Sequence, residues 1–69
     1  LAGNRKALPV LGLLLQDQQP QPRLTAARAL GKIGERVSVP LLKKALQDTD
    51  PAVRITAAGS LALLLSRKQ

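Results

Sequence analysis

Few residues in this chain could do chemistry, and their types exclude most kinds of catalytic site. The 69 residues contain no Cys and no His, and the only carboxylates are those of Asp17, Glu35, Asp48 and Asp50. Without a thiol or an imidazole, the chain lacks the usual nucleophile and base pairs and nearly every zinc ligand set. Asp48 and Asp50 stand where a turn and a helix cap are expected, so they are not interpreted as an acid–base pair. The sequence therefore predicts a protein that is not an enzyme, with no catalytic residue, no cofactor and no metal.

A second group of side chains has the pattern of an anion-binding site. Thr25, Arg28, Lys32 and Arg36 follow one another at helical spacing, and Arg67 stands 31 positions after Arg36. The chain has 11 Lys and Arg against four acidic residues, which gives a net charge of +7. This pattern suits a groove for an acidic peptide or a phosphate backbone, and it suits equally the solvated face of a surface helix. These five residues are the candidate partner-binding site.

Two further pairs of charged residues have equal spacing, with an Asp six positions before an Arg. They are Asp17 with Arg23 and Asp48 with Arg54. Because the same pair recurs at the same expected turn, a structural role is favoured over a charged functional site.

The elements that must position these residues follow from an internal repeat. RLTAARAL, which begins at Arg23, returns 31 positions later as RITAAGSL at Arg54. A period of this length is typical of helical repeat arrays. We expect a single domain made of the end of a preceding repeat over residues 1–4, a repeat over 5–36 and a second repeat over 37–69. The chain is thus expected to be a slice of a longer array.

The apolar periodicity predicts an all-α fold with four helices, of which two lie in the first repeat. The first helix is expected over about residues 5–16, with Asn4 as its cap. The second is expected over residues 20–33 and to end at Gly34, which suits the left-handed position after a helix.

The second repeat contains the other two predicted helices. Ser38 is expected to cap the third helix. Asp50 as a cap and Pro51 at the first helical position mark the start of the fourth, which is expected to continue through Leu65. Leu63 and Leu65 are apolar where the repeat pattern expects a surface. They could cover an end of the array, lie buried against neighbouring structure or form a dimer contact, and burial is favoured.

The chain AARALGKIGERVSVPLLKKALQDTDPAVRITAA resembles HEAT repeats, and most of all the short HEAT-like repeat of phycobilin (PBS) lyases. The motifs that carry the resemblance are P-x-L-x-x-x-L, D-x-x-P, V-R-x-x-A-A-x-x-L and G-x-I-G. The resemblance implies an α-solenoid fragment of about two antiparallel helical hairpins, with the second helix of each hairpin lining the concave face. It also implies that the charged pairs form a structural ladder, in which each Asp reaches Arg and backbone N–H groups between repeats.

The leading hypothesis for function is a protein-interaction scaffold that binds an acidic protein partner through basic residues on its concave face. Two alternatives stay open: nucleic-acid binding by the same face, and a scaffold role within a bilin-lyase-like protein. No aromatic residue is present to stack on bases, so nucleic acid would be held through its phosphates. No stretch reaches the roughly 20 apolar residues of a membrane span. A cytoplasmic location is expected, and the oligomeric state stays open.

Overall fold

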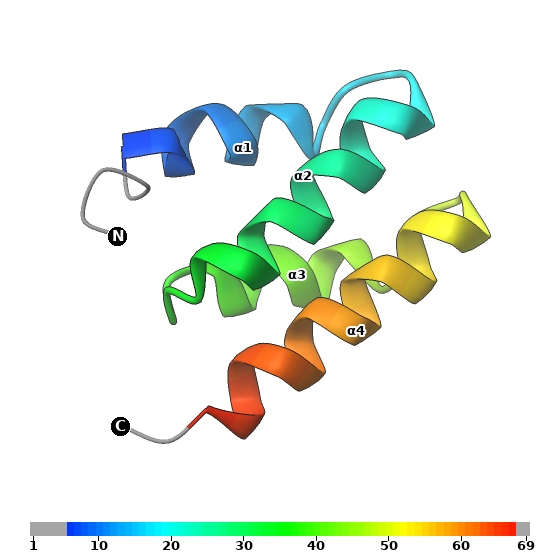
Figure 1. Cartoon of the computed structure of the whole chain (residues 1–69). Helices are drawn as coiled ribbons and strands as arrows, with labels where there is room; N and C mark the ends of the chain where they lie inside the picture. The colour runs from blue at the N-terminus through cyan, green and yellow to red at the C-terminus, as the bar shows by residue number, and fades with distance from the viewer. Residues whose placement is uncertain (1–5, 68–69) are drawn as a thin grey trace.

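The computed structural model describes residues 6–67, and this part of the chain forms four α-helices (Figure 1). Helix α1 spans Leu8–Leu14, α2 spans Pro20–Ile33, α3 spans Ser38–Ala45 and α4 spans Pro51–Ser66. They form two helical hairpins, α1–α2 and α3–α4. Helices α2 and α4 lie side by side and run in the same direction, while α1 and α3 form a second layer. The predicted all-α fold of two helical hairpins is confirmed.

Proline, aspartate and glycine set the limits of the two longer helices. Helices α2 and α4 both begin with Pro, whose missing N–H costs nothing at the first helical position. The Asp50 carboxylate caps α4 by accepting hydrogen bonds from the backbone N–H of Ala52 at 2.7 Å and of Val53 at 3.3 Å. Helix α2 ends at Gly34, which has φ of 76°. The limits predicted for α2 are therefore correct, and α4 runs one residue beyond Leu65.

Ser38 does not cap α3, so that prediction is wrong. Ser38 is the first residue of α3, it is fully buried, and its hydroxyl has no hydrogen-bond partner among residues 6–67. The preceding turn forms its own hydrogen bonds, from the N–H of Ser38 to the carbonyl of Glu35 and from that of Val39 to the carbonyl of Arg36, both 3.0 Å. These bonds bring Ser38 itself into the helix. A capping side chain accepts from the N–H groups two or three residues ahead, and at the first of these positions Pro40 has no N–H to donate. The hydroxyl is left in the core.

The first helix is shorter than predicted, since α1 spans Leu8–Leu14 rather than residues 5–16. After α1 the chain tightens, and the N–H of Gln16 donates to the carbonyl of Leu13 at 3.0 Å. Such a three-residue turn keeps successive side chains close to the face of the helix before it. The apolar spacing therefore continues past the end of the α-helix. Asn4, the predicted cap, lies outside the described residues.

The core is aliphatic and built largely of small side chains. Three of its members are fully buried and large, namely Leu30, Leu42 and Val53. Isolated helices of 7 to 16 residues are marginal in water, so burial of such side chains decides whether these helices form. Each fully buried aliphatic side chain contributes about 1.5–3 kcal/mol.

Helices α2 and α4 are in close contact at Gly31 and Ser60. The Ser60 hydroxyl donates a hydrogen bond of 2.6 Å to the carbonyl of Ala27, one turn before Gly31. A Cβ atom at Gly31 would lie 2.6 Å from the Cβ and 2.9 Å from the Cα of Ser60. Only a hydrogen atom fits at that position, so Gly31 sets the distance between the two helices.

We predict opposite effects for alanine at two glycines in helix interiors. Gly31→Ala should destabilise the fold by about 1–3 kcal/mol, because the added methyl group overpacks the α2–α4 contact. Gly59→Ala should stabilise it by about 0.5–1 kcal/mol, because no atom lies within 4 Å of the added methyl group and alanine favours the helix. Urea unfolding followed by circular dichroism measures both. Equal stabilisation by the two substitutions would contradict the close contact.

Ser38, the first residue of α3, and Asp50, which precedes α4, give a second pair of variants. Ser38→Ala should leave the free energy of unfolding unchanged or raise it, because it removes a buried hydroxyl that has no partner. Asp50→Ala should lower it by about 1 kcal/mol, because it removes the cap of α4. A loss of similar size in Ser38→Ala would show that Ser38 does act as a cap.

Candidate functional site

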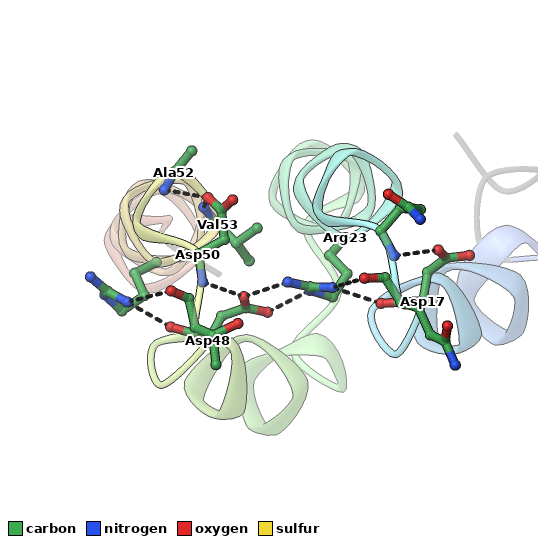
Figure 2. A network of polar contacts seen from close by, with 10 residues as sticks. Asp17, Arg23, Asp48, Asp50, Ala52 and Val53 are labelled. Carbon is green, nitrogen blue, oxygen red and sulfur yellow. Dashed lines mark hydrogen bonds and ion pairs between the residues drawn. The ribbon is translucent and has the colours of Figure 1, made fainter.

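Arg23 joins the two hairpins through a forked ion pair (Figure 2). Its Nε donates to Oδ2 of Asp48 at 2.8 Å, and its Nη2 donates to Oδ1 at 2.9 Å. Asp48 lies in the turn between α3 and α4, whereas Arg23 lies in the first turns of α2. The two side chains are only 13% and 11% exposed. A planar guanidinium that meets a carboxylate in this way fixes both the distance and the angle between their elements.

The third nitrogen of the same guanidinium closes the turn of its own hairpin. Nη1 of Arg23 donates to the backbone carbonyl of Asp17 at 2.8 Å and to that of Gln18 at 3.1 Å. The Asp17 carboxylate instead accepts the N–H of Gln19 at 2.9 Å. Within one repeat, Arg therefore contacts the backbone of its Asp, and the ion pair runs to the Asp of the following repeat.

The second repeat shows the same local arrangement. Oδ1 of Asp48 accepts the N–H of Asp50 at 2.9 Å, and Nη1 of Arg54 donates to the carbonyls of Asp48 at 2.7 Å and Thr49 at 3.3 Å. The four ladder residues thus order two turns and join them once, through Arg23 and Asp48. With both charges of that pair engaged and shielded, this cluster has the character of a structural joint.

The ion pair shifts both acid–base equilibria. Hydrogen bonds from Arg23 lower the pKa of the Asp48 carboxyl below its ordinary value of 3.8, the N–H of Asp50 lowers it further, and burial opposes the change. The same hydrogen bond raises the pKa of Arg23. The pair therefore stays charged over the whole neutral range.

The basic candidate residues lie elsewhere, on the solvent side of α2 and beyond its end. Thr25, Arg28 and Lys32 are exposed on α2, and Arg36 is exposed in the turn that follows. Arg67, at the end of α4, places its guanidinium against Gly34. The carbonyl end of a helix attracts cations, so Arg67 and Lys32 also suit the end of α2 electrostatically. All five residues thus lie along α2 or at its C-terminal end.

The corresponding face of α4 has no charge. Thr56, Gly59 and Leu63 stand 31 positions after Thr25, Arg28 and Lys32; Thr56 is half-buried, and the other two are exposed. The exposed face of the α2–α4 layer thus combines a basic helix with a neutral one. That neutrality leaves the positive charge concentrated along α2.

One feature of the surface was not predicted from the sequence. A hollow of about 210 Å³ lies between α1 and α3 and is lined by Gly12, Leu15, Gln16, Leu41, Lys44, Ala45 and Asp48. Gly12 stands where the second repeat has Lys43, and its missing side chain was the only signal in the sequence. The hollow has the size of one or two side chains and lies in the opposite layer from the basic residues.

The described part of the chain shows no arrangement for metal chemistry. Among residues 6–67, no three His, Cys, Asp or Glu side chains are grouped so that they could hold a metal ion. No helix in the same part is long and apolar enough to cross a bilayer.

Comparison with known proteins identifies the repeat. The family model for HEAT repeats matches residues 2–68, which is nearly the whole chain. No significant match was found among curated proteins or among solved structures. The family match agrees with the two helical hairpins described above.

We predict that Asp48→Asn lowers the free energy of unfolding at pH 7. It should also remove most of the decrease in this free energy that acid causes in the unmodified chain. A carboxyl with a lowered pKa stabilises the fold above its unfolded pKa, and this contribution is lost as the pH falls through the lowered folded value. Urea unfolding at pH 7, 5 and 3 should therefore show the gap between the two proteins closing below about pH 4. Asp50→Asn makes the same change of charge and keeps a capping side chain, so it serves as the control. Parallel pH profiles for Asp48→Asn and the unmodified chain would contradict the role of the ion pair.

Proposed function

The chain belongs to the HEAT-repeat family, and we propose that it is a non-enzymatic protein-interaction module that binds an acidic segment of a partner protein. HEAT repeats generally act as protein-interaction scaffolds. The proposed contact surface is the exposed face of α2, with Thr25, Arg28 and Lys32, extended by Arg36 and Arg67 at its C-terminal end. The proposal takes this surface as the concave face of a solenoid.

The observation that carries this proposal is the separation of charge between helices and turns. Helices α1 to α4 contain no acidic residue, and all four carboxylates lie in the turns. Asp48 is bound by Arg23, Asp50 caps α4 and Asp17 orders its own turn. Among residues 6–67, Arg28 and Lys32 have no carboxylate partner, so an acidic partner would gain charge-assisted hydrogen bonds without breaking any.

The spacing of the cations favours a particular kind of acidic segment. Arg28 and Lys32 are four residues apart, or about 6 Å along the helix. Carboxylates two positions apart in an extended peptide are separated by about 6.6 Å, and those one turn apart on a helix by about 6 Å. Next to this row, Gly59 and Leu63 offer an open, uncharged strip. A segment with alternating acidic and aliphatic residues fits both strips.

Phosphate-rich nucleic acid is the competing partner for a basic helix. Its binding would depend steeply on salt, because each phosphate contact releases counterions. A scaffold role within a bilin-lyase-like protein is the second alternative, and it rests on the sequence resemblance alone. Because the chain has neither Cys nor His, in that role it would position other parts of the protein and would not itself react with a bilin.

We predict that the double substitution Arg28→Glu and Lys32→Glu weakens binding of a short Glu-rich peptide at least about tenfold, or about 1.4 kcal/mol. The matched control is Lys43→Glu with Lys44→Glu, which makes the same change of charge on exposed residues of α3. The control should alter affinity less than about twofold, and both variants should keep the circular dichroism of the unmodified chain.

Fluorescence anisotropy with the labelled peptide and with a short DNA duplex measures these affinities over a range of salt. Equal losses in both double variants would show that binding follows net charge rather than the α2 surface. Tighter binding of the duplex than of the peptide, with a steep salt dependence, would favour nucleic acid as the partner.

A further inference from the structure

Within residues 6–67, the outer edge of α4 is apolar and uncovered. Ile55, Ala58, Ala62 and Leu65 are exposed along it, with Ile55 at 72% and Leu65 at 61%. Ile55, Ala58 and Ala62 stand 31 positions after Leu24, Ala27 and Gly31. Ala27 and Gly31 contact Ser60 of α4, so the same edge of α2 is the one that α4 covers.

The opposite end of the molecule has a matching apolar edge on α1. The hollow that faces α1 is lined by Leu41 and Lys44 of α3 and by Asp48 of the turn that follows. Their equivalents 31 positions earlier are Val10, Leu13 and Asp17. Val10 is 57% exposed and Leu13 is 72% exposed. The edge of α3 that faces α1 is therefore covered, whereas the equivalent edge of α1 is exposed.

The charges at the two ends are complementary. Arg54 holds its own turn through Nη1, as Arg23 does, but its Nε and Nη2 have no carboxylate among residues 6–67. Asp17 orders its own turn through Oδ1, as Asp48 does, but no Arg reaches its carboxylate within the described chain. One end thus exposes the donor half of the Arg23–Asp48 joint, and the other end exposes the acceptor half.

We propose that two copies of this chain associate head to tail, with the α3–α4 end of one copy on the α1–α2 end of the next and Arg54 paired with Asp17 across the contact. Within one chain, the second hairpin is placed on the first by a particular rotation and translation. In the proposed contact, a similar rotation and translation place the first hairpin of the next copy on the second hairpin. Such a contact is heterologous, so it continues into open chains and does not stop at a dimer.

The contact between copies is looser than the contact between hairpins. Ala62 of one copy would face Ala29 of the next copy, as Gly31 faces Ser60 within the chain. Because Ala62 has a Cβ where Gly31 has none, the same spacing would put it too close, since a Cβ at Gly31 would lie only 2.6 Å from the Cβ of Ser60. The helices of two copies therefore stay farther apart and bury less surface. Weak association, visible only at high protein concentration, follows from this difference.

The test uses two variants that each lose one end. Ile55→Lys blocks the α4 end and Leu13→Lys blocks the α1 end; both residues are exposed, so the fold is retained and circular dichroism checks it. Sedimentation velocity at concentrations up to about 1 mM, which reaches weak affinities, should show the unmodified chain forming a concentration-dependent series of species. Each variant alone should stay monomeric, and an equimolar mixture should form a 1:1 complex and nothing larger.

Three results would overturn the proposal. The first is an unmodified chain that stays monomeric at every concentration. The second is continued dimerisation of Leu13→Lys alone, which would indicate a symmetric contact through α4. The third is an equimolar mixture of the two variants that forms no 1:1 complex. Charge reversal tests the pairing: Arg54→Glu and Asp17→Arg should each weaken association about tenfold, and their mixture should recover it. Failure to recover, with both variants folded, would also overturn the pairing. Arg28→Glu with Lys32→Glu should leave association unchanged, which separates this contact from the proposed partner-binding surface.

Discussion

The parallel contact between α2 and α4 is the constraint on which the rest of the structure depends. It is held at one end by the fork of Arg23 on Asp48, along its length by Gly31 against Ser60, and at the other end by Arg67 over Gly34. A core without aromatic residues cannot bridge a wide gap between helices, so close approach is the only way to fill it. The small residues and the ion pair therefore act together, because the fork sets the angle that lets the small residues meet.

The same contact explains where the charges can go. The edges of α2 and α4 that touch must be small and neutral, and the turns need carboxylates to bind N–H groups. Basic side chains can then lie on the outward faces of the helices, where they neither separate the two helices nor compete with the carboxylates of the turns. Lys32 and Arg67 gain from the carbonyl end of α2, but Arg28 lies in the middle of the helix and gains nothing there. Arg28 is thus the basic residue of α2 with the least structural reason to be present.

Much of this fold could be predicted from the sequence, and the failures have physical causes. The start of α4 and both limits of α2 were correct because Pro, Asp and Gly act through local backbone chemistry. Ser38 was misread because the hydrogen bonds of the preceding turn start the helix before it, and because Pro40 has no N–H for its hydroxyl to bind. The ladder residues stand out in the sequence by their spacing of six. The family resemblance implied that Asp and Arg meet between repeats. The packing of the two hairpins shows which residues meet, because it joins Arg23 to Asp48, 25 positions away.

The two surfaces of this chain become linked if copies stack by the operation that relates its hairpins. A solenoid grows in one dimension, so its end faces and its inner face are separate and can be occupied together. Each added copy would contribute one basic helix and one neutral helix to the inner face, because Gly59 and Leu63 replace Arg28 and Lys32 in alternate positions. Along the inner face of such a stack, every second helix would carry a row of basic side chains. A partner with acidic clusters at that wider spacing would then bind several copies at once, and its affinity would rise with the length of the stack through effective concentration, without any new contact.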